Sequence, residues 1–218
     1  MQHPAPPAAP GHPASGSPAP VRPVFARHAA SLLVLRDGPG GTEVLMGMRG
    51  AGHRFMPNRL VFPGGAVDPG DAALPAAAEP RPEVLAMLGR GARPRLARAL
   101  VAAAARELEE ETGLTLGIPP RLDGVDYLCR AVTPPSSPIR FNARFLVVDA
   151  SCVSGTLAGS GELEGLGYLQ VAEAVALDLA VVTREVLQRL QLWLALPPAA
   201  RPAREKLDVF KKRQWRLE

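Results

Sequence analysis

The sequence has only two cysteines, no long apolar run and only a small excess of positive charge. Cys129 and Cys152 are not spaced as C-x-x-C, and a chain of 218 residues can bury a core without disulfides, so we expect two reduced core thiols. Because no run of about 18 apolar residues occurs, we expect no transmembrane helix. The first residues also lack the basic and apolar regions of a secretory signal. These absences predict a cytoplasmic protein that does not bind membranes.

The charge pattern does not indicate a nucleic-acid binder. Lys and Arg number 25 against 21 Asp and Glu, which gives a net charge of +4. The basic residues are scattered except at Lys211, Lys212 and Arg213. We expect residues 201–218 to form a basic, solvated C-terminal tail. The 24 prolines and 21 glycines show no collagen period, and 47% hydrophobic residues are typical of a chain that folds around a core.

The pattern along the chain predicts an N-terminal arm followed by one folded domain. Residues 1–23 consist mainly of Pro, Ala, Gly and Ser and cannot offset their ordering entropy by burial, so we expect a disordered arm. Residues 24–200 form the predicted domain. Its predicted strands are 28–37, 42–49, 58–68, 123–133, 138–151 and 165–171, and its predicted helices are 82–89, 95–114 and 183–196. Strands flanking separate helices predict a mixed sheet of the α+β class, covered on both faces.

The predicted helix 95–114 ends in an acidic face. Glu107, Glu110 and Glu111 are spaced i, i+3 and i+4, so their carboxylates lie on one face. Like charges at this spacing destabilise a helix, and the helix macrodipole disfavours anions at the C-terminal end. A bound divalent cation explains the cluster because it needs hard oxygen ligands. The alternative is a solvated acidic face with Arg106 as a surface partner.

Two segments together resemble the signature of the Nudix hydrolase family, G-x-x-x-x-x-E followed by R-E-U-x-E-E-x-G-U, where U is a bulky aliphatic residue. The second half is complete from Arg106 to Leu114. The glycine of the first half is Gly65, preceded by Gly64, and Asp71 stands where the family has glutamate. The resemblance implies an α/β/α sandwich with a mixed sheet and an inserted loop and helix between the two halves of the signature.

The first half of the signature departs from the family in two ways. Asp71 is one methylene shorter than glutamate, which shortens its reach toward a metal or Arg106. Between these two residues lie 34 others, so the signature carries an insertion at about 72–94. Long loops over a site commonly serve as lids or specificity elements, so we expect a flap beside the cleft. Glu79 or Glu83 could supply a carboxylate from it, or both could be solvated.

The split signature resembles the acyl-coenzyme A diphosphatase branch of the family. The run Val61-Phe62-Pro63-Gly64-Gly65 is similar to that branch, although Asn58 replaces the branch's upstream glycine. The substrate-binding residues that we expect are Arg54, Phe62, Gly65, Arg140 and Arg144. The first of these arginines stands at the branch's upstream arginine position, and could equally be a surface residue. The other two share one face of a predicted strand, where they could bind phosphates or simply face solvent.

The resemblance implies metal-dependent hydrolysis of a diphosphate linkage in a nucleotide. The first candidate substrate is coenzyme A or acyl-coenzyme A, which would give 3′,5′-ADP and phosphopantetheine. The implied ligands of Mg²⁺ or Mn²⁺ are Glu107, Glu110, Glu111, the Gly64 carbonyl and Asp71. Either Glu110 or Glu107 would deprotonate the attacking water, and Arg106 would orient a glutamate. One alternative is hydrolysis of another dinucleotide or nucleotide sugar, and a second is a nucleotide-binding module with weak catalysis.

Overall fold

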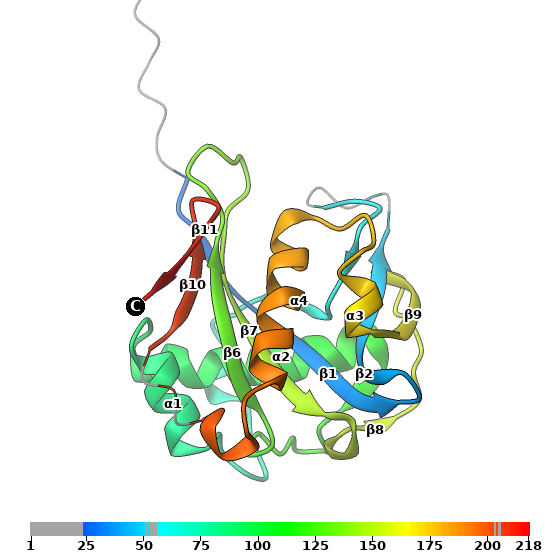
Figure 1. The fold of residues 1–218 in the computed structure, drawn as a ribbon. Helices are drawn as coiled ribbons and strands as arrows, with labels where there is room; N and C mark the ends of the chain where they lie inside the picture. The colour runs from blue at the N-terminus through cyan, green and yellow to red at the C-terminus, as the bar shows by residue number, and fades with distance from the viewer. Residues whose placement is uncertain (1–23, 51, 53–55, 203, 205) are drawn as a thin grey trace, which may run out of the picture.

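The fold is built on one mixed sheet. The computed structural model describes residues 24–50, 52, 56–202, 204 and 206–218, so the predicted arm 1–23 and Arg54 lie outside the described residues. Within that part, nine strands form the sheet in the order β11-β10-β6-β7-β1-β2-β3, with β4 beside β1 and β9 beside β2 (Figure 1). They are β1 (Arg27–Gly38), β2 (Gly41–Arg49), β3 (Leu60–Val61), β4 (Gly64–Ala66), β6 (Asp126–Val132), β7 (Phe141–Asp149), β9 (Leu163–Gln170), β10 (Asp208–Lys211) and β11 (Gln214–Leu217).

β1 is the central strand because both of its faces are buried from Leu32 to Leu35. It runs parallel to β7 from Arg27 to Leu35 and pairs with β2 through a tight antiparallel turn at Gly38 and Gly41. The two strands predicted at 28–37 and 42–49 are therefore confirmed.

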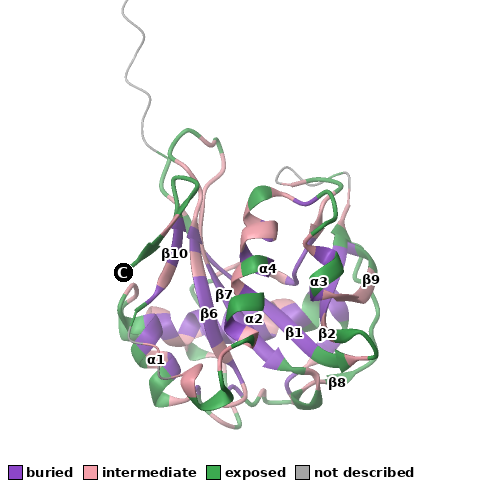
Figure 2. Cartoon of the chain, in the orientation of Figure 1, coloured by how far each residue is buried: buried purple, intermediate pink, exposed green. Residues whose placement is uncertain are grey.

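Helices cover both faces of the sheet. One face packs against α1 (Pro82–Gly89) and α2 (Pro94–Thr112), and the other packs against α3 (Val171–Ala174) and α4 (Val181–Leu194). Alternation along β1 supplies both cores, since Leu32 contributes to the first and Leu33 to the second. Figure 2 shows the buried residues concentrated where the helices meet the strands. The predicted α+β class and two-sided covering are confirmed.

The remaining elements are β5 (Leu114–Thr115), which pairs with β8 (Ser154–Gly155), and the 3₁₀ turns η1 (Asp71–Ala73), η2 (Ala150–Cys152) and η3 (Pro198–Ala200).

The predicted strand 58–68 is broken into β3 and β4 at Phe62-Pro63. Proline has no backbone N–H for a ladder, so the strand cannot continue through it. Gly64 follows with φ 152°, and a side chain there would overlap the Ala30 carbonyl on β1. β4 then pairs with the start of β1, which fixes the two glycines against the centre of the sheet.

The insertion 72–94 packs against the core and does not form a flap beside the cleft. Its helix α1 buries Val84, Met87 and Leu88 against the face of the sheet that α2 covers. Among the described residues, the insertion forms β-type pairing only through an isolated bridge between Ala78 and Arg121. The expectation of a flap was wrong because these apolar side chains have a core within reach, and burying them outweighs the cost of ordering the loop.

The C-terminal segment 201–218 is not a solvated tail. Its residues include the hairpin β10–β11, and β10 extends the sheet by pairing parallel with β6. Val209 and Phe210 are buried, which explains why this basic segment is folded. Of the two cysteines, Cys129 is buried as expected, whereas Cys152 is exposed. No helix in the described part of the chain is long and apolar enough to cross a membrane.

Candidate active site

Helix α2 delivers the acidic cluster. Its small, apolar face packs on β1, and its end is set by Gly113, which adopts the left-handed conformation that glycine tolerates best. The three glutamates emerge at different depths. Glu111 is buried, Glu107 is largely buried, and the Glu110 side chain is 57% exposed. The cluster is therefore not a uniformly solvated acidic face.

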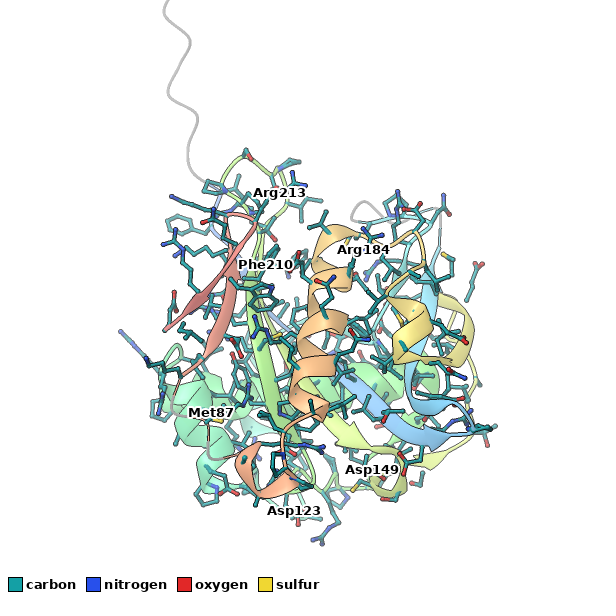
Figure 3. The ribbon with its side chains drawn as sticks, viewed as in Figure 1. Met87, Asp123, Asp149, Arg184, Phe210 and Arg213 are labelled. Atoms are coloured by element: carbon teal, nitrogen blue, oxygen red, sulfur yellow. The ribbon has the colours of Figure 1, made fainter. Side chains whose placement is uncertain are left out.

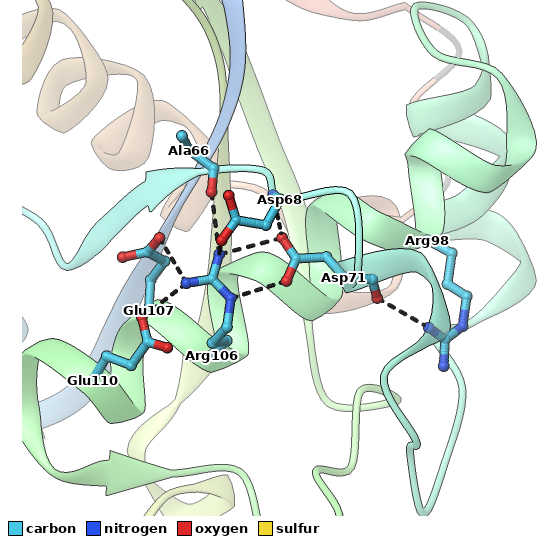
Figure 4. A network of polar contacts seen from close by, with 7 residues as sticks. All are labelled: Ala66, Asp68, Asp71, Arg98, Arg106, Glu107 and Glu110. Atoms are coloured by element: carbon cyan, nitrogen blue, oxygen red, sulfur yellow. Dashed lines mark hydrogen bonds and ion pairs between the residues drawn. The ribbon is translucent and has the colours of Figure 1, made fainter.

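Arg106 lies at the centre of a polar network at the base of the site (Figure 4). Its Nη1 donates to Glu107 Oε1 at 2.9 Å and to Glu110 Oε2 at 2.8 Å. Its Nη2 donates to the Ala66 carbonyl at 3.1 Å, which links the helix to β4. One guanidinium thus fixes two of the three carboxylates relative to the glycine strand, and it has no donor left for a substrate on that side. The expectation that Arg106 orients a glutamate agrees with these contacts.

Asp71 anchors this arginine. Its carboxylate accepts from Arg106 Nε at 2.9 Å and from Nη2 at 3.2 Å, and it also accepts from the Asp68 backbone N–H at 2.7 Å. Asp71 is only 2% exposed. Because these bonds occupy it, Asp71 serves as the partner of Arg106 and does not act as a metal ligand in this arrangement. The 3₁₀ turn η1 carries the aspartate to the helix, so the shorter side chain still reaches its partner.

Glu111 joins the helix to the glycine turn. Its Oε2 accepts from the Gly64 N–H at 2.7 Å. Burial raises the pKa of Glu111 to about 8, and the negative charges of Glu107 and Glu162 act in the same direction. Burial likewise raises the pKa of Glu107, although Arg106 opposes that shift. The site therefore holds carboxylates whose negative charge is poorly compensated by the protein alone.

Two further charged residues lie near the carboxylates of Glu107 and Glu111, and the sequence did not predict either of them. Glu162, just before β9, is near enough to raise the pKa of both Glu107 and Glu111. Arg49, at the end of β2, lowers the pKa of Glu111, and its buried Nε has no hydrogen-bond partner among the described residues. No local motif marks either residue. They meet because Arg49 pairs across β2 and β9 with Leu163, next to Glu162.

The donor set suits a hard divalent cation, although it is not a preformed cage. In the described part of the chain, no three acidic, histidine or cysteine side chains are grouped as metal ligands. Two of the predicted ligands, Glu107 and Glu110, are turned toward Arg106. The desolvated and mutually repelling carboxylates nevertheless fit a cation, because added positive charge would relieve their repulsion. The carboxylates available to hold it are those of Glu107, Glu110 and Glu111.

A cleft of about 740 Å³ opens beside the carboxylates. Gly64, Gly65 and the four glutamates line one part of it, and a side chain on Gly65 would overlap the Glu107 carboxylate. The rest of the lining is mainly apolar and includes Phe62, Ala131, Val132, Phe141, Ala143, Phe145, Val181 and Phe210. Phe62 and Phe145 pack edge to face with centroids 6.1 Å apart. The cleft thus joins an acidic end to an apolar floor.

The two arginines predicted to share one face of the strand 138–151, Arg140 and Arg144, do not line the cleft. Arg144 is buried on the opposite face of the strand, where it donates to the Gly91 carbonyl at 2.7 Å and to the Asn142 carbonyl at 2.9 Å. Burial lowers the pKa of Arg144 to about 10. Arg140 donates to the backbone carbonyls of Thr133 and Val24. Within β7, Phe141, Ala143 and Phe145 occupy the face toward the cleft, and β7 begins only after Arg140. Arg54 lies outside the described residues.

The comparisons with known proteins agree on one fold. The structure is similar to that of a NUDIX hydrolase from Alicyclobacillus acidocaldarius, with 26% identity, 75% of this chain and 90% of that chain covered, and a TM-score of 0.57. The fold is that of a Nudix hydrolase. A MutT protein from Methanosarcina mazei Go1 is also similar in fold, with 18% identity, 79% and 99% coverage and a TM-score of 0.50. No protein-family model matches the chain, and no curated protein matches it.

The Nudix fold accounts for the position of the signature residues. Its helix, here α2, carries Arg106 to Thr112, and the glycine strand β4 lies across the start of β1. Both halves of the signature meet at the Arg106 network although the insertion separates them in sequence. The protein from Alicyclobacillus acidocaldarius is a NUDIX hydrolase, and this chain shares its fold.

Proposed function

We propose that the chain is a divalent-metal-dependent pyrophosphohydrolase that cleaves a diphosphate linkage in a nucleoside diphosphate derivative. The observation that carries the proposal is the set of carboxylates from Glu107, Glu110, Glu111 and Glu162 at one end of an apolar cleft. A diphosphate repels these carboxylates unless a cation lies between them, and a nucleobase or acyl group suits the aromatic floor. The metal would neutralise the diphosphate charge and make water a better nucleophile.

The protein's own residues have separate tasks in this proposal. Glu110 and Glu111 would hold the cation, and the Gly64 N–H fixes the second of them with a hydrogen bond of 2.7 Å. Arg49 lines the cleft, and its guanidinium is suited to a phosphate oxygen. The glycines allow the diphosphate to approach the backbone because they present no side chain.

Glu107 is the better candidate of the two residues proposed as general base. Burial raises its pKa, whereas the Glu110 side chain is 57% exposed. A base works best when its pKa lies near the operating pH, so a carboxylate with a raised pKa accepts a proton more readily. Arg106 positions Glu107 through a 2.9 Å hydrogen bond. Glu162 adds nearby negative charge that favours protonation of Glu107.

Coenzyme A or an acyl-coenzyme A is the substrate that we propose first. The support is the resemblance of Val61–Gly65 to the acyl-coenzyme A diphosphatase branch and the apolar floor beside the carboxylates. The support from Arg140 and Arg144 falls away, because neither lines the cleft. Other nucleoside diphosphate derivatives remain the alternative. The alternative of a nucleotide-binding module with weak catalysis is disfavoured, because Asp71 still accepts two hydrogen bonds from Arg106 although it is shorter than the family's glutamate.

The proposal is tested with a panel of coenzyme A, dephospho-coenzyme A, NADH, ADP-ribose and ATP, each with Mg²⁺ or Mn²⁺. Chromatography of the products identifies the bond that is cleaved. We expect 3′,5′-ADP and phosphopantetheine from coenzyme A, and no reaction in EDTA. Turnover of NADH or ADP-ribose without coenzyme A cleavage would favour the alternative substrate class. Absence of any metal-dependent hydrolysis across the panel would contradict the proposed reaction.

A further inference from the structure

Two arginines, Arg27 and Arg213, line the cleft at the edge of the sheet where β1 begins and β10 ends. Arg27 pairs with Phe141 on β7, and the next strand, β6, ends beside Lys211 of β10. The first residues of β1 and β7 and the last residues of β6 and β10 therefore share one edge. Neither arginine forms a side-chain hydrogen bond or ion pair with another residue in the described parts of the chain.

This edge is remote from the carboxylates. Glu111 is tied to Gly64, and Gly64 pairs with Ser31 on β1. Arg27 lies four residues earlier on the same strand, which is about 13 Å of backbone at about 3.3 Å per residue. Arg213 lies on the far side of β7 and β6 from that strand. The cleft therefore has an acidic end, an apolar floor and a cationic edge.

The hairpin that carries Arg213 is firmly attached to α4. The Trp215 indole N–H donates to Glu185 at 2.6 Å, and the Arg189 guanidinium stacks on the same ring at 4.3 Å. Arg189 also forms a 3.1 Å ion pair with Asp208 at the start of β10. Figure 3 shows Arg213 at the tip of this hairpin and Phe210 lower on β10. These contacts attach both strands of the hairpin to α4, which reduces the cost of ordering the hairpin when a ligand binds.

The turn at the tip places two non-glycine residues in a backbone conformation that they rarely adopt. Lys212 and Arg213 both have positive φ, at 52° and 61°. Two-residue hairpin turns of this kind strongly favour Asn-Gly, because the left-handed conformation is unfavourable for other L-residues. The turn nevertheless consists of two positively charged residues, and the second of them, Arg213, lines the cleft.

We infer that Arg213, together with Arg27, binds a second anionic group of the substrate, separated from the scissile diphosphate by the apolar floor of the cleft. The inference rests on the proposed function, because it assumes that the diphosphate lies at the carboxylates. A guanidinium grips a phosphate or carboxylate with two parallel hydrogen bonds. The substrate class that follows is a nucleoside diphosphate derivative with an additional phosphate or carboxylate.

The test uses two pairs of compounds that differ by one phosphate: coenzyme A with dephospho-coenzyme A, and NADP⁺ with NAD⁺. Values of kcat/KM are measured for the wild type, Arg213→Ala, Arg213→Lys and the control Arg216→Ala. The control residue is exposed on the same hairpin and does not line the cleft. For at least one pair, we expect Arg213→Ala to lose tenfold or more on the phosphorylated member and less than threefold on its partner. Arg213→Lys should recover part of the loss, and Arg216→Ala should match the wild type.

Calorimetric binding without divalent cations separates the inference from the proposed reaction, because it needs no turnover. We expect the wild type to bind the phosphorylated member of a pair more tightly, and Arg213→Ala to lose that difference. Equal affinities within both pairs for the wild type would overturn the inference, as would a difference that persists in Arg213→Ala. If the wild type hydrolyses none of the four compounds but shows the binding difference, the proposed reaction fails for them and the anion site stands.

Discussion

Asp71 is expected to govern both stability and activity, because it is the buried end of the Arg106 network. Asp71→Asn keeps the shape of the side chain but removes the charge, and its amide cannot accept both guanidinium bonds. A charge-assisted hydrogen bond contributes about 1.5–3 kcal/mol, and breaking a buried ion pair costs about 3–5 kcal/mol. Since the Arg106 side chain is 20% exposed, water can compensate part of the loss. We therefore expect the free energy of unfolding to fall by about 2–4 kcal/mol.

The assay compares Asp71→Asn with Glu79→Gln. The control removes a carboxylate that also binds an arginine twice, Arg98, at 2.8 Å for each bond, but the Glu79 side chain is 56% exposed. An exposed pair contributes about 0–1 kcal/mol, so the control should lose little. For Asp71→Asn we expect Tm to fall by roughly 6–12 °C and kcat/KM to fall about a hundredfold as the glutamates lose their alignment. Equal losses in the two variants, or full activity of Asp71→Asn, would refute the reasoning.

Four other predictions follow from the site and the chain. Glu110→Gln should lower kcat by orders of magnitude while leaving the urea midpoint nearly unchanged, and full activity in it would contradict a metal role. Gly64→Ala should destabilise the fold strongly, because its side chain would overlap the Ala30 carbonyl; unfolding by urea measures this, and a wild-type midpoint would argue against the close approach. The pKa of Glu111 in the folded protein is raised to about 8, so between about pH 4.5 and 8 its carboxyl is ionised in the unfolded chain but protonated in the folded one. In the absence of metal, the free energy of unfolding should therefore fall as the pH rises through this range, by at most about 1.4 kcal/mol per pH unit. Glu111→Gln should flatten that profile, and an unchanged profile would count against the shift. Deleting residues 1–23 should leave Tm and turnover nearly unchanged, whereas a drop of many degrees would show that the arm is docked.

Local patterns in the sequence were enough to place the acidic residues of α2 and the first hairpin. The i, i+3, i+4 spacing placed Glu107, Glu110 and Glu111 on one side of α2, because helix geometry fixes that relation whatever surrounds it. Gly113 set the end of the helix through its own backbone freedom. The turn after Gly38 set the first hairpin in the same way. Each of these features depends on residues within a few positions of one another, so sequence alone determined them.

Other features depend on which strands pair and which face a helix covers. The alternation on β7 predicted that Arg144 and Phe145 point in opposite directions, but only the packing of α2 and α4 decided which of them faces the cleft. The shorter Asp71 reaches Arg106 because the turn η1 lies against α2, which spacing along the chain does not indicate.

The cleft itself was decided by contacts between distant parts of the chain. Glu162 and Arg49 come together through the pairing of β2 with β9, and Arg213 reaches the cleft through the pairing of β10 with β6. The turn Lys212-Arg213 lacks the Asn-Gly signal of a tight hairpin, so nothing local marked the C-terminal segment as part of the sheet. Such pairings are set by burial of apolar strands across the whole domain, and this is why only the tertiary structure shows which charges share the site.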